Sequence, residues 1–336
     1  MIASATGVEL VLRRAVAFAS RQRLFEPGDR VLVGMGSDSA SLGLLGFLTH
    51  ARASLGVAEI AVAAIERRLD EESDDAEQVA DLGRLARQMG LTFHAVRPAL
   101  QGRRVRVLEE LRKLATEQGH TRIALAPTRD DDAARVLCEL LRGRGMTAIR
   151  GLAPRVSGTV VRPLLALERS EAASLASLLG FESPMLPPEA PDPARDRLLP
   201  ALEAAILPRL RALMPGSSAA LARLGRESRR LQRMFAHDAK ALVSASAGVA
   251  HPDHLELDAA VFLGPRGPWV ARAALRALCP ASDGTHLRHD AHALTRAVLH
   301  PRDLARAEAL VLHGATATMD RRSGRVQLRR RAVRSG

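Results

Sequence analysis

Apolar residues in the first half of the chain form two kinds of pattern. Short, nearly continuous apolar runs are typical of strands buried on both faces, and longer segments with apolar residues every three or four positions are typical of amphipathic helices. The predicted strands are residues 31–33, 59–65, 91–96, 122–126 and 160–163. The predicted helices are residues 8–22, 39–53, 74–89, 105–117 and 131–141. This alternation predicts an α/β fold with a doubly wound parallel sheet, in which ligands bind beyond the carboxyl ends of the strands.

A different pattern follows a proline-rich stretch at residues 183–194. Residues 197–248 have helical periodicity and many Arg residues, and a break follows at residues 251–253. The final part predicts a small α+β unit, with helices near residues 269–278 and 290–299 and strands at residues 309–312, 316–320 and 326–330. The expected domains are therefore residues 1–185, a helical region at 186–250 and a C-terminal domain at 251–336.

The charge of the chain favours polyanionic partners. The 336 residues carry a formal net charge of +12, which supports contacts with phosphate groups. Only Lys113 and Lys240 are lysines among the 49 basic residues, so an arginine-biased, GC-rich coding sequence is an equally simple origin of this charge. Aromatic residues make up 2% of the chain, which argues against base stacking on an aromatic platform.

The sequence predicts a cytoplasmic protein without a membrane anchor. No apolar run is long enough to span a bilayer, and the first 16 residues carry charges that predict an amphipathic helix rather than a secretory signal. Cys138 and Cys279 are too few and too far apart in sequence for a disulfide framework. The two His residues of HPDH at residues 251–254 lack the further ligands of a zinc site.

A glycine-containing turn separates the first predicted strand from its helix. Backbone N–H groups in such a turn, together with the positive end of the helix dipole, form an anion site. A Walker loop is excluded because no Lys precedes the Ser, and the dinucleotide pattern is excluded because Ser39 stands where its last Gly belongs. By itself, the turn is as compatible with a purely structural connection between strand and helix as it is with an anion-binding site.

Several motifs together favour an anion-binding turn over a purely structural one. GMGSDS at residues 34–39 resembles the S-G-G-x-D-S pyrophosphate loop of the PP-loop ATP pyrophosphatases. Further segments resemble one branch of these proteins, the tRNA(Ile)-lysidine synthetases, in the same order along nearly the whole chain. These segments are EESDDAE (71–77), APTRDDDAAR (126–135), LLRGRG (140–145), VRPLL (161–165), residues 194–210, and GATAT (314–318) through RVQL (325–328).

The resemblance implies an activity and a set of site residues. In the resembled family, ATP adenylates the C2 oxygen of the wobble cytidine in an isoleucine tRNA with a CAU anticodon, and lysine then displaces AMP. ATP and Mg²⁺ are the implied cofactors, free lysine and tRNA the implied partners, and a monomer or homodimer the expected state. The implied nucleotide-binding residues are Gly34, Met35, Gly36, Ser37, Asp38, Ser39 and Ala64. The implied catalytic residues are Asp38, Asp130, Asp131 and Arg142, with Asp38 and Asp131 as metal ligands. The implied tRNA contacts are Arg142, Arg162, Arg195 and Arg197.

Plainer interpretations of these residues stay open. Asp130 and Asp131 suit the N-terminal end of the helix predicted at residues 131–141, where acidic side chains interact favourably with the helix dipole. Arg142 suits the C-terminal end of that helix, followed by Gly143. Arg162 is also compatible with a surface position at a strand end.

The sequence departs from the family pattern mainly at the expected active site. Gly34 and Met35 replace Ser and Gly, and we expect Met35 to need a backbone conformation that Gly adopts without strain. Pro127 and Thr128 replace two His residues of the second motif. In the same motif Ala134 replaces Glu, and Arg129 brings a cation beside the carboxylates.

These departures leave two functions open: a divergent active synthetase, or a non-catalytic RNA-binding or interaction protein. A thiolation enzyme is disfavoured because there is no C-x-x-C pair, and an amidotransferase-type synthetase is disfavoured because no glutaminase domain is recognisable.

Overall fold

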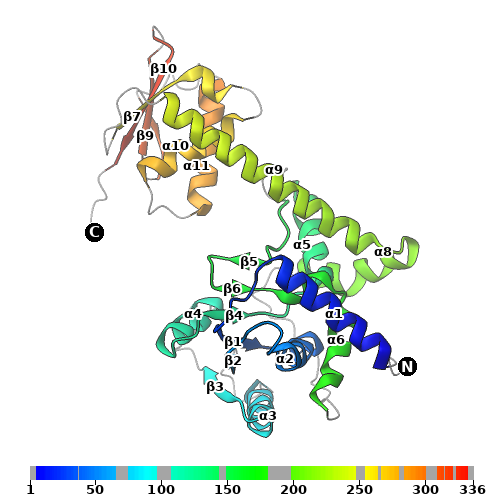
Figure 1. The fold of residues 1–336 in the computed structure, drawn as a ribbon. Coiled ribbons are helices and arrows are strands. Elements are labelled where there is room, and N and C mark those ends of the chain that lie inside the picture. Colours follow the sequence, from blue (N-terminus) through cyan, green and yellow to red (C-terminus); the bar gives the residue numbers. More distant parts are fainter. Residues whose placement is uncertain are drawn as a thin grey trace. The chain divides into compact units, whose positions relative to one another are not determined.

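The computed structural model describes most of the chain, in two compact units within residues 1–228 and 229–336 (Figure 1). The described residues are 5–36, 38–65, 75–96, 107–143, 149–180, 198–246, 254–263, 266–279, 284–299, 309–313, 315–320 and 323–331. The expected boundaries at residues 185 and 250 fall outside these ranges, so the three-domain division stays a prediction.

The first unit is built on a six-stranded sheet. Its strands are β1 (Arg30–Met35), β2 (Glu59–Ile65), β3 (Thr92–Val96), β4 (Arg122–Ala124), β5 (Arg155–Val156) and β6 (Val160–Val161). Its first helices are α1 (Ala5–Arg21), α2 (Ser39–Ala51), α3 (Asp75–Gln88), α4 (Val107–Glu117), α5 (Arg129–Leu141) and α6 (Arg169–Ser174), with the 3-10 turns η1 (Pro163–Ala166) and η2 (Leu175–Leu179). The strand order is β3-β2-β1-β4-β6-β5, and every neighbouring pair is parallel except β5 with β6.

Helices cover both faces of this sheet. Successive side chains of a strand point to opposite faces. Val31 and Val33 of β1 accordingly pack in the core that α1 and α2 share, whereas Leu32 packs in a second core with Leu111 of α4. Burial on both faces explains why the central strands read as nearly continuous apolar runs.

Two glycines bring α2 against its neighbours at backbone distance. A Cβ atom at Gly43 would lie 1.8 Å from the carbonyl oxygen of Ala172 in α6. A Cβ atom at Gly46 would lie 2.2 Å from the carbonyl oxygen of Leu175 in η2. Only glycine allows the backbones to come this close. These contacts hold α2, the helix that follows the glycine-containing turn, in its position.

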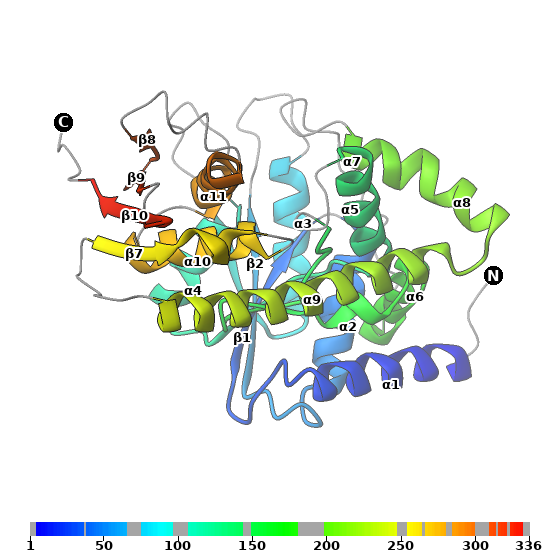
Figure 2. The same cartoon turned by 90° about the horizontal axis from the view of Figure 1, so that it is seen from above.

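Further helices complete the first unit. They are α7 (Leu198–Ala201), the π-helical turn η3 (Leu202–Ile206), α8 (Leu207–Leu213) and the start of α9 (Ser217–Ser246). Helix α7 lies beside α5 (Figure 2), and Leu207 packs in a small core with Ala133 and Ala134 of α5. This contact brings η3 and α8 close to the beginning of α5.

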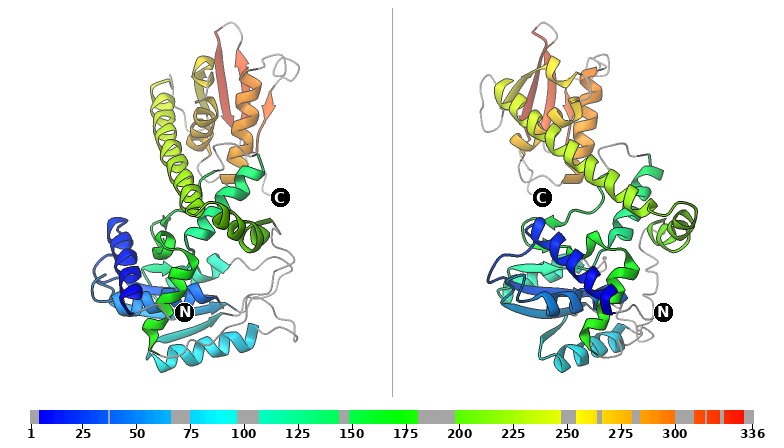
Figure 3. Two further views of the ribbon diagram at one scale, coloured as in Figure 1. Left: turned by 90° about the vertical axis from the view of Figure 1, so that its right-hand side faces the viewer. Right: turned by 45° about the vertical axis from the view of Figure 1, so that its right-hand side comes forward.

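The second unit contains a four-stranded antiparallel sheet and two helices. Its elements are β7 (His254–Asp258), η4 (Ala259–Phe262), α10 (Gly267–Leu278), α11 (Gly284–Leu299), β8 (Leu310–Val311), β9 (Ala315–Asp320) and β10 (Arg325–Arg330). The strand order is β7-β10-β9-β8. Helices α10 (gold) and α11 (orange) pack against each other (Figure 3), and Trp269 and Leu294 share their core with Leu257 of the sheet.

The predicted fold class is confirmed, with local differences. Strand β2 has the predicted bounds, whereas β4 ends at Ala124 and α5 begins at Arg129, two residues earlier than predicted in each case. Strands β5 and β7 were not predicted, and for β5 the reason is that a strand of two residues has no recognisable period. Strand β5 also gives the predicted parallel sheet an antiparallel edge.

Candidate functional site

The turn after β1 joins the carboxyl end of a central strand to the first turn of α2. The N–H of Gly36 donates to the hydroxyl of Ser41 at 3.1 Å. The Ser41 hydroxyl in turn donates to Oδ2 of Asp38 at 2.9 Å. Because Ser41 is buried, these bonds fix the turn from inside the protein. Ser37 lies outside the described residues.

Asp38 is the N-cap of α2. Its backbone is extended, with φ −95° and ψ 155°, and its Oδ1 accepts a hydrogen bond from the N–H of Ser41 at 2.9 Å. Both carboxylate oxygens therefore contact Ser41, which satisfies one of the N–H groups that lack an intrahelical partner at a helix start. Ser39 follows as the first residue of α2 and is exposed.

The two altered positions of the turn fit their surroundings. A Cβ atom at Gly34 would lie 2.8 Å from Leu125 and 2.9 Å from Leu111, so leucine side chains fill the space that a Ser side chain would need. The expectation that Met35 needs a glycine-type backbone is wrong. Met35 ends β1 with its side chain in the core, and the described non-glycine residues with positive φ are Arg23 and Ser157.

Ala64 lies next to this turn. It is buried in β2 and pairs in register with Met35 at the end of β1. The ends of the two neighbouring strands thus bring Ala64 close to the turn after β1. Its contact with a nucleotide stays a prediction.

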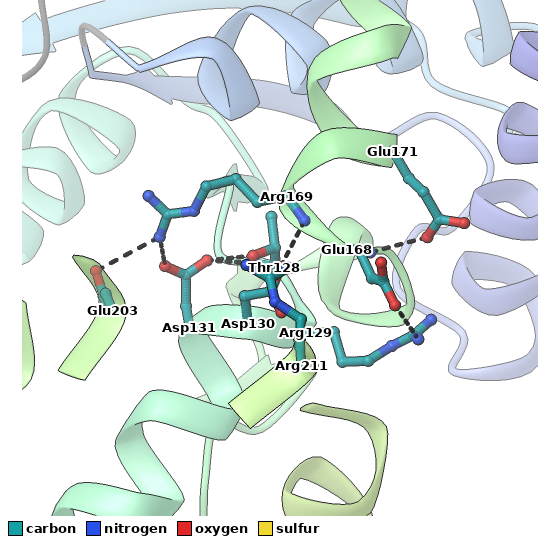
Figure 4. Close-up of polar contacts among 9 residues, drawn as sticks. All are labelled: Thr128, Arg129, Asp130, Asp131, Glu168, Arg169, Glu171, Glu203 and Arg211. Carbon is teal, nitrogen blue, oxygen red and sulfur yellow. Dashed lines mark hydrogen bonds and ion pairs between the residues drawn. The ribbon is translucent and has the colours of Figure 1, made fainter. Parts of the chain in front are cut away.

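The second element of the site is the start of α5, which follows β4 (Figure 4). Thr128 is the N-cap and is fully buried. Oδ2 of Asp131 accepts hydrogen bonds from the N–H and the hydroxyl of Thr128, both at 2.6 Å. Asp131 thus occupies the third helical position of a capping box, in which the acidic side chain satisfies the N–H of the N-cap residue.

Asp130 lies beside Asp131 but points into the protein. It is 4% exposed, and its Oδ2 accepts a hydrogen bond from the N–H of Arg169 at 2.9 Å. The same oxygen lies 3.3 Å from Nη1 of Arg211 in α8. Among the described residues, Oδ1 of Asp130 has no hydrogen-bond partner.

Arg169 connects the carboxylates of three elements. Its Nη2 donates to Oδ1 of Asp131 at 2.5 Å and lies 3.5 Å from Oε2 of Glu203 in η3 (Figure 4). Burial lowers the pKa of Arg169, but Asp131, then Glu203, and also Asp38 and Asp130, outweigh burial and raise it. Asp38 therefore lies within electrostatic range of this guanidinium.

Arg129 has different partners from those expected. Its Nη1 lies 3.4 Å from Oε1 of Glu168, and its Nη2 donates to the carbonyl of Ala166. The expected cation beside Asp130 and Asp131 is thus supplied by Arg169 and Arg211, while the guanidinium of Arg129 points to η1 and the start of α6 (Figure 4).

The remaining predicted arginines are not brought to this cluster. Arg142 is the C-cap of α5, about 18 Å from Asp130 at the rise of an α-helix, and pairs with Glu139 at 3.5 Å. Arg162 donates to the carbonyl of Ala153 at 2.7 Å. Arg195 and Arg197 lie outside the described residues. The structure therefore does not place Arg142 with the other expected catalytic residues, and its role stays a prediction.

The carboxylates do not fit the expected Mg²⁺ site in their present contacts. Asp38 is engaged by Ser41, and Asp131 is engaged by Thr128 and Arg169. In the described part of the chain no group of three or more His, Cys, Asp or Glu side chains is arranged to hold a metal ion. The assignment of Asp38 and Asp131 to a metal stays a prediction that these contacts do not favour.

Sequence reasoning missed four residues of this site: Ser41, Arg169, Glu203 and Arg211. The sequence does contain two signals for a helix start: Asp38 before the apolar residues of α2, and the capping-box spacing of Thr128 and Asp131. No local pattern indicates Arg169, because its partners come from segments distant in sequence.

The comparisons with known proteins agree with this geometry. Residues 12–182 match the family model of the PP-loop domain. The fold also resembles that of a tRNA thiolase from Methanococcus maripaludis, with a TM-score of 0.53 at 14% identity over 68% of this chain and 80% of that chain. The fold and the turn after β1 thus define a PP-loop domain, a class of ATP-binding domains.

Comparison with curated relatives identifies the family of PP-loop proteins to which the chain belongs. A tRNA(Ile)-lysidine synthase from Thermobifida fusca is 32% identical over 296 residues, which cover 81% of this chain and 84% of the relative. The chain belongs to the tRNA(Ile)-lysidine synthase family. Another relative of that name, from Solibacter usitatus, is 36% identical over 157 residues, or 44% of this chain and 34% of the relative. This chain therefore aligns with about one third of that longer protein.

Among the described helices, none combines the length and the apolar character that a membrane crossing requires.

Proposed function

We propose that this protein modifies tRNA in an ATP-dependent reaction, adenylating the C2 oxygen of the wobble cytidine of an isoleucine tRNA and joining lysine to form lysidine. The observation that carries the proposal is the alignment of 81% of this chain with 84% of the Thermobifida fusca relative, which is named tRNA(Ile)-lysidine synthase. The turn between β1 and α2 supports it, because a helix start of this kind suits phosphate groups.

The reaction has two steps. In the first, the C2 oxygen attacks the α-phosphorus of ATP, a new O–P bond forms, and pyrophosphate leaves with the electrons of the broken P–O bond. In the second, the amine of lysine attacks C2 and loses a proton, and AMP leaves with the original C2 oxygen. Adenylation converts an unreactive carbonyl carbon into one that carries a good leaving group, which divides a difficult substitution into two easier steps.

Residues of α2 are suited to hold the phosphates. The N–H groups of Ser39 and Ala40 belong to the first turn of α2, where no intrahelical carbonyl is available to them. The exposed hydroxyl of Ser39 supplies a further donor. Asp38 acts as a positioning residue, because its contacts with Ser41 fix the direction of this turn. Donors fixed in advance stabilise charge that develops on phosphate oxygens without reorganising during the reaction.

The positive charge of the chain suits the tRNA. Arg142, Arg162, Arg195 and Arg197 are the proposed contacts, and arginine suits phosphate because it stays charged and donates in a fixed fork. A formal net charge of +12 supports such contacts over a larger surface.

A second candidate function is tRNA binding without catalysis. The observation that favours it is the engagement of both oxygens of Asp131 by Thr128 and Arg169. In this alternative the fold and the basic residues serve RNA binding, and the carboxylates serve only stability.

Transfer of radiolabelled lysine onto an isoleucine tRNA transcript with a CAU anticodon, with ATP and Mg²⁺ present, separates the two candidates. The proposed function predicts ATP-dependent incorporation into this transcript and none into a matched transcript whose wobble base is G. Absence of incorporation, with the transcript still bound by folded protein, would favour the second candidate.

A further inference from the structure

We propose that Arg169 takes the place of a divalent cation at the carboxylate cluster of Asp130, Asp131 and Glu203, and that phosphate groups at this site receive their positive charge from it. The inference rests on the proposed function in one respect, since it takes the adjacent turn to be a polyphosphate site. The part that concerns metal ions does not depend on ATP or tRNA.

The contacts of Arg169 show that it occupies the position of a cation among the carboxylates. Its guanidinium reaches Asp131 at 2.5 Å and Glu203 at 3.5 Å, and its backbone N–H holds Asp130 at 2.9 Å. One residue therefore binds carboxylates from α5 and η3 with two different donor groups. These are the oxygen atoms that a hard divalent cation in the cluster would need as ligands.

The charges at the cluster also oppose the entry of a divalent ion. An arginine guanidinium stays charged at any ordinary pH. That of Arg169 lies within 3.5 Å of carboxylate oxygens of both Asp131 and Glu203. Arg211 adds a second cation, 3.3 Å from Oδ2 of Asp130. A divalent ion entering the cluster would meet two positive groups, which lowers its affinity.

Arg169 also has N–H donors that are suited to bind an anion. Its Nη2 is the guanidinium nitrogen that contacts Asp131 and Glu203, and Nε and Nη1 have no acceptor among the described residues. The side chain is 47% exposed. These two nitrogen atoms, which have no acceptor in the described part of the chain, belong to a guanidinium that is already held in place, and their N–H groups suit the oxygens of a phosphate group. Arg169 thus has the geometry to neutralise carboxylates on one side and to bind an anion on the other.

Binding of Mn²⁺ to the full chain, measured by electron paramagnetic resonance without nucleotide, tests the metal part. We expect no tight Mn²⁺ site in the wild type, and weak Mn²⁺ binding that becomes at least about tenfold stronger in Arg169→Gln, because the carboxylates lose their cation. Arg129→Gln is the matched control, since Arg129 pairs with Glu168, and it should behave as the wild type. A tight Mn²⁺ site in the wild type would overturn the proposal, and this result needs no variant to fold.

Calorimetric titration with ATP tests the anion part. Wild-type affinity should change less than about threefold between excess EDTA and Mg²⁺, whereas Arg169→Gln should lose at least about tenfold in EDTA and Arg169→Lys should retain most of the affinity. ATP binding by the wild type that requires Mg²⁺ would overturn the proposal. Loss of lysine transfer with both binding results intact would instead contradict the proposed function alone.

Discussion

Asp38 and Asp131 both stabilise the start of a helix that follows a central strand. Asp38 is the N-cap of α2 and accepts hydrogen bonds from Ser41, whereas Asp131 is the third residue of α5 and accepts them from Thr128 and from Arg169. The plainer interpretation, in which acidic residues stabilise helix starts, therefore describes contacts that exist in the structure. It does not compete with the nucleotide interpretation, because a fixed helix start is what a phosphate site needs.

Two substitutions of Asp38 distinguish its role as a helix cap from the role of its negative charge. Asp38→Ala should cost about 1 kcal/mol of stability through the lost cap, and should reduce tRNA-dependent AMP release at least about 100-fold because the turn loses its direction. Asp38→Asn keeps a good N-cap and should retain a melting temperature close to that of the wild type and more than about a tenth of the activity. An asparagine variant that melts like the wild type and is as inactive as the alanine variant would show that the charge matters and the cap does not.

His120 gives the stability of the first unit a pH dependence. It is buried, and neither ring nitrogen has a hydrogen-bond partner among the described residues. Burial lowers the pKa of His120 from 6.5 more than Glu59 raises it, and Arg30 and His94 lower it further. The unfolded chain therefore binds a proton at His120 before the folded chain does, and stability should fall as the pH drops below about 6.5.

Urea unfolding at pH 7.5 and pH 5.5 measures this effect. The loss of stability between the two values should be smaller in His120→Leu than in the wild type, whereas the exposed His50→Leu should leave the loss unchanged. An equal loss in the wild type and both variants would assign the pH dependence to other groups.

Helix α2 is the element on which the site depends. Its position is fixed by the approach of Gly43 to Ala172 and of Gly46 to Leu175. Gly43→Ala should destabilise the protein by about 3 kcal/mol or more, because a backbone carbonyl has less room to move than a side chain. Thr49→Ala, on the exposed side of the same helix, should stay within about 0.5 kcal/mol of the wild type. Thermal unfolding measures both, and an unchanged Gly43→Ala protein would contradict the packing described here.

The sequence was informative for elements whose signal is local. The period of the apolar residues predicted β1, β2, α2 and α5 near their observed bounds, and the turn motif lies where it was expected, at the carboxyl end of β1. Contacts between distant segments were not predictable in this way. Arg169 meets Asp131 only after η1 and α6 pack beside α5, and no local pattern in the sequence specifies that meeting.

The charge of the whole molecule predicts how tRNA binding responds to salt. If arginine contacts with phosphate supply most of the affinity, counterions are released on binding and the affinity falls as salt is added. The affinity for the CAU transcript should fall at least about tenfold between 50 and 200 mM KCl, with a slope in log–log form that counts phosphate contacts. An affinity unchanged within about twofold would mean that the net charge of +12 does not serve RNA binding.

The central claim for the whole molecule is that its PP-loop domain activates a tRNA base with ATP. The most direct measurement incubates the protein with the CAU transcript and ATP labelled at the α-phosphate, first without lysine and then with it. The account predicts label that stays on the tRNA until lysine is added and then leaves as AMP. A folded protein that binds the transcript but never transfers label to it would contradict the claim.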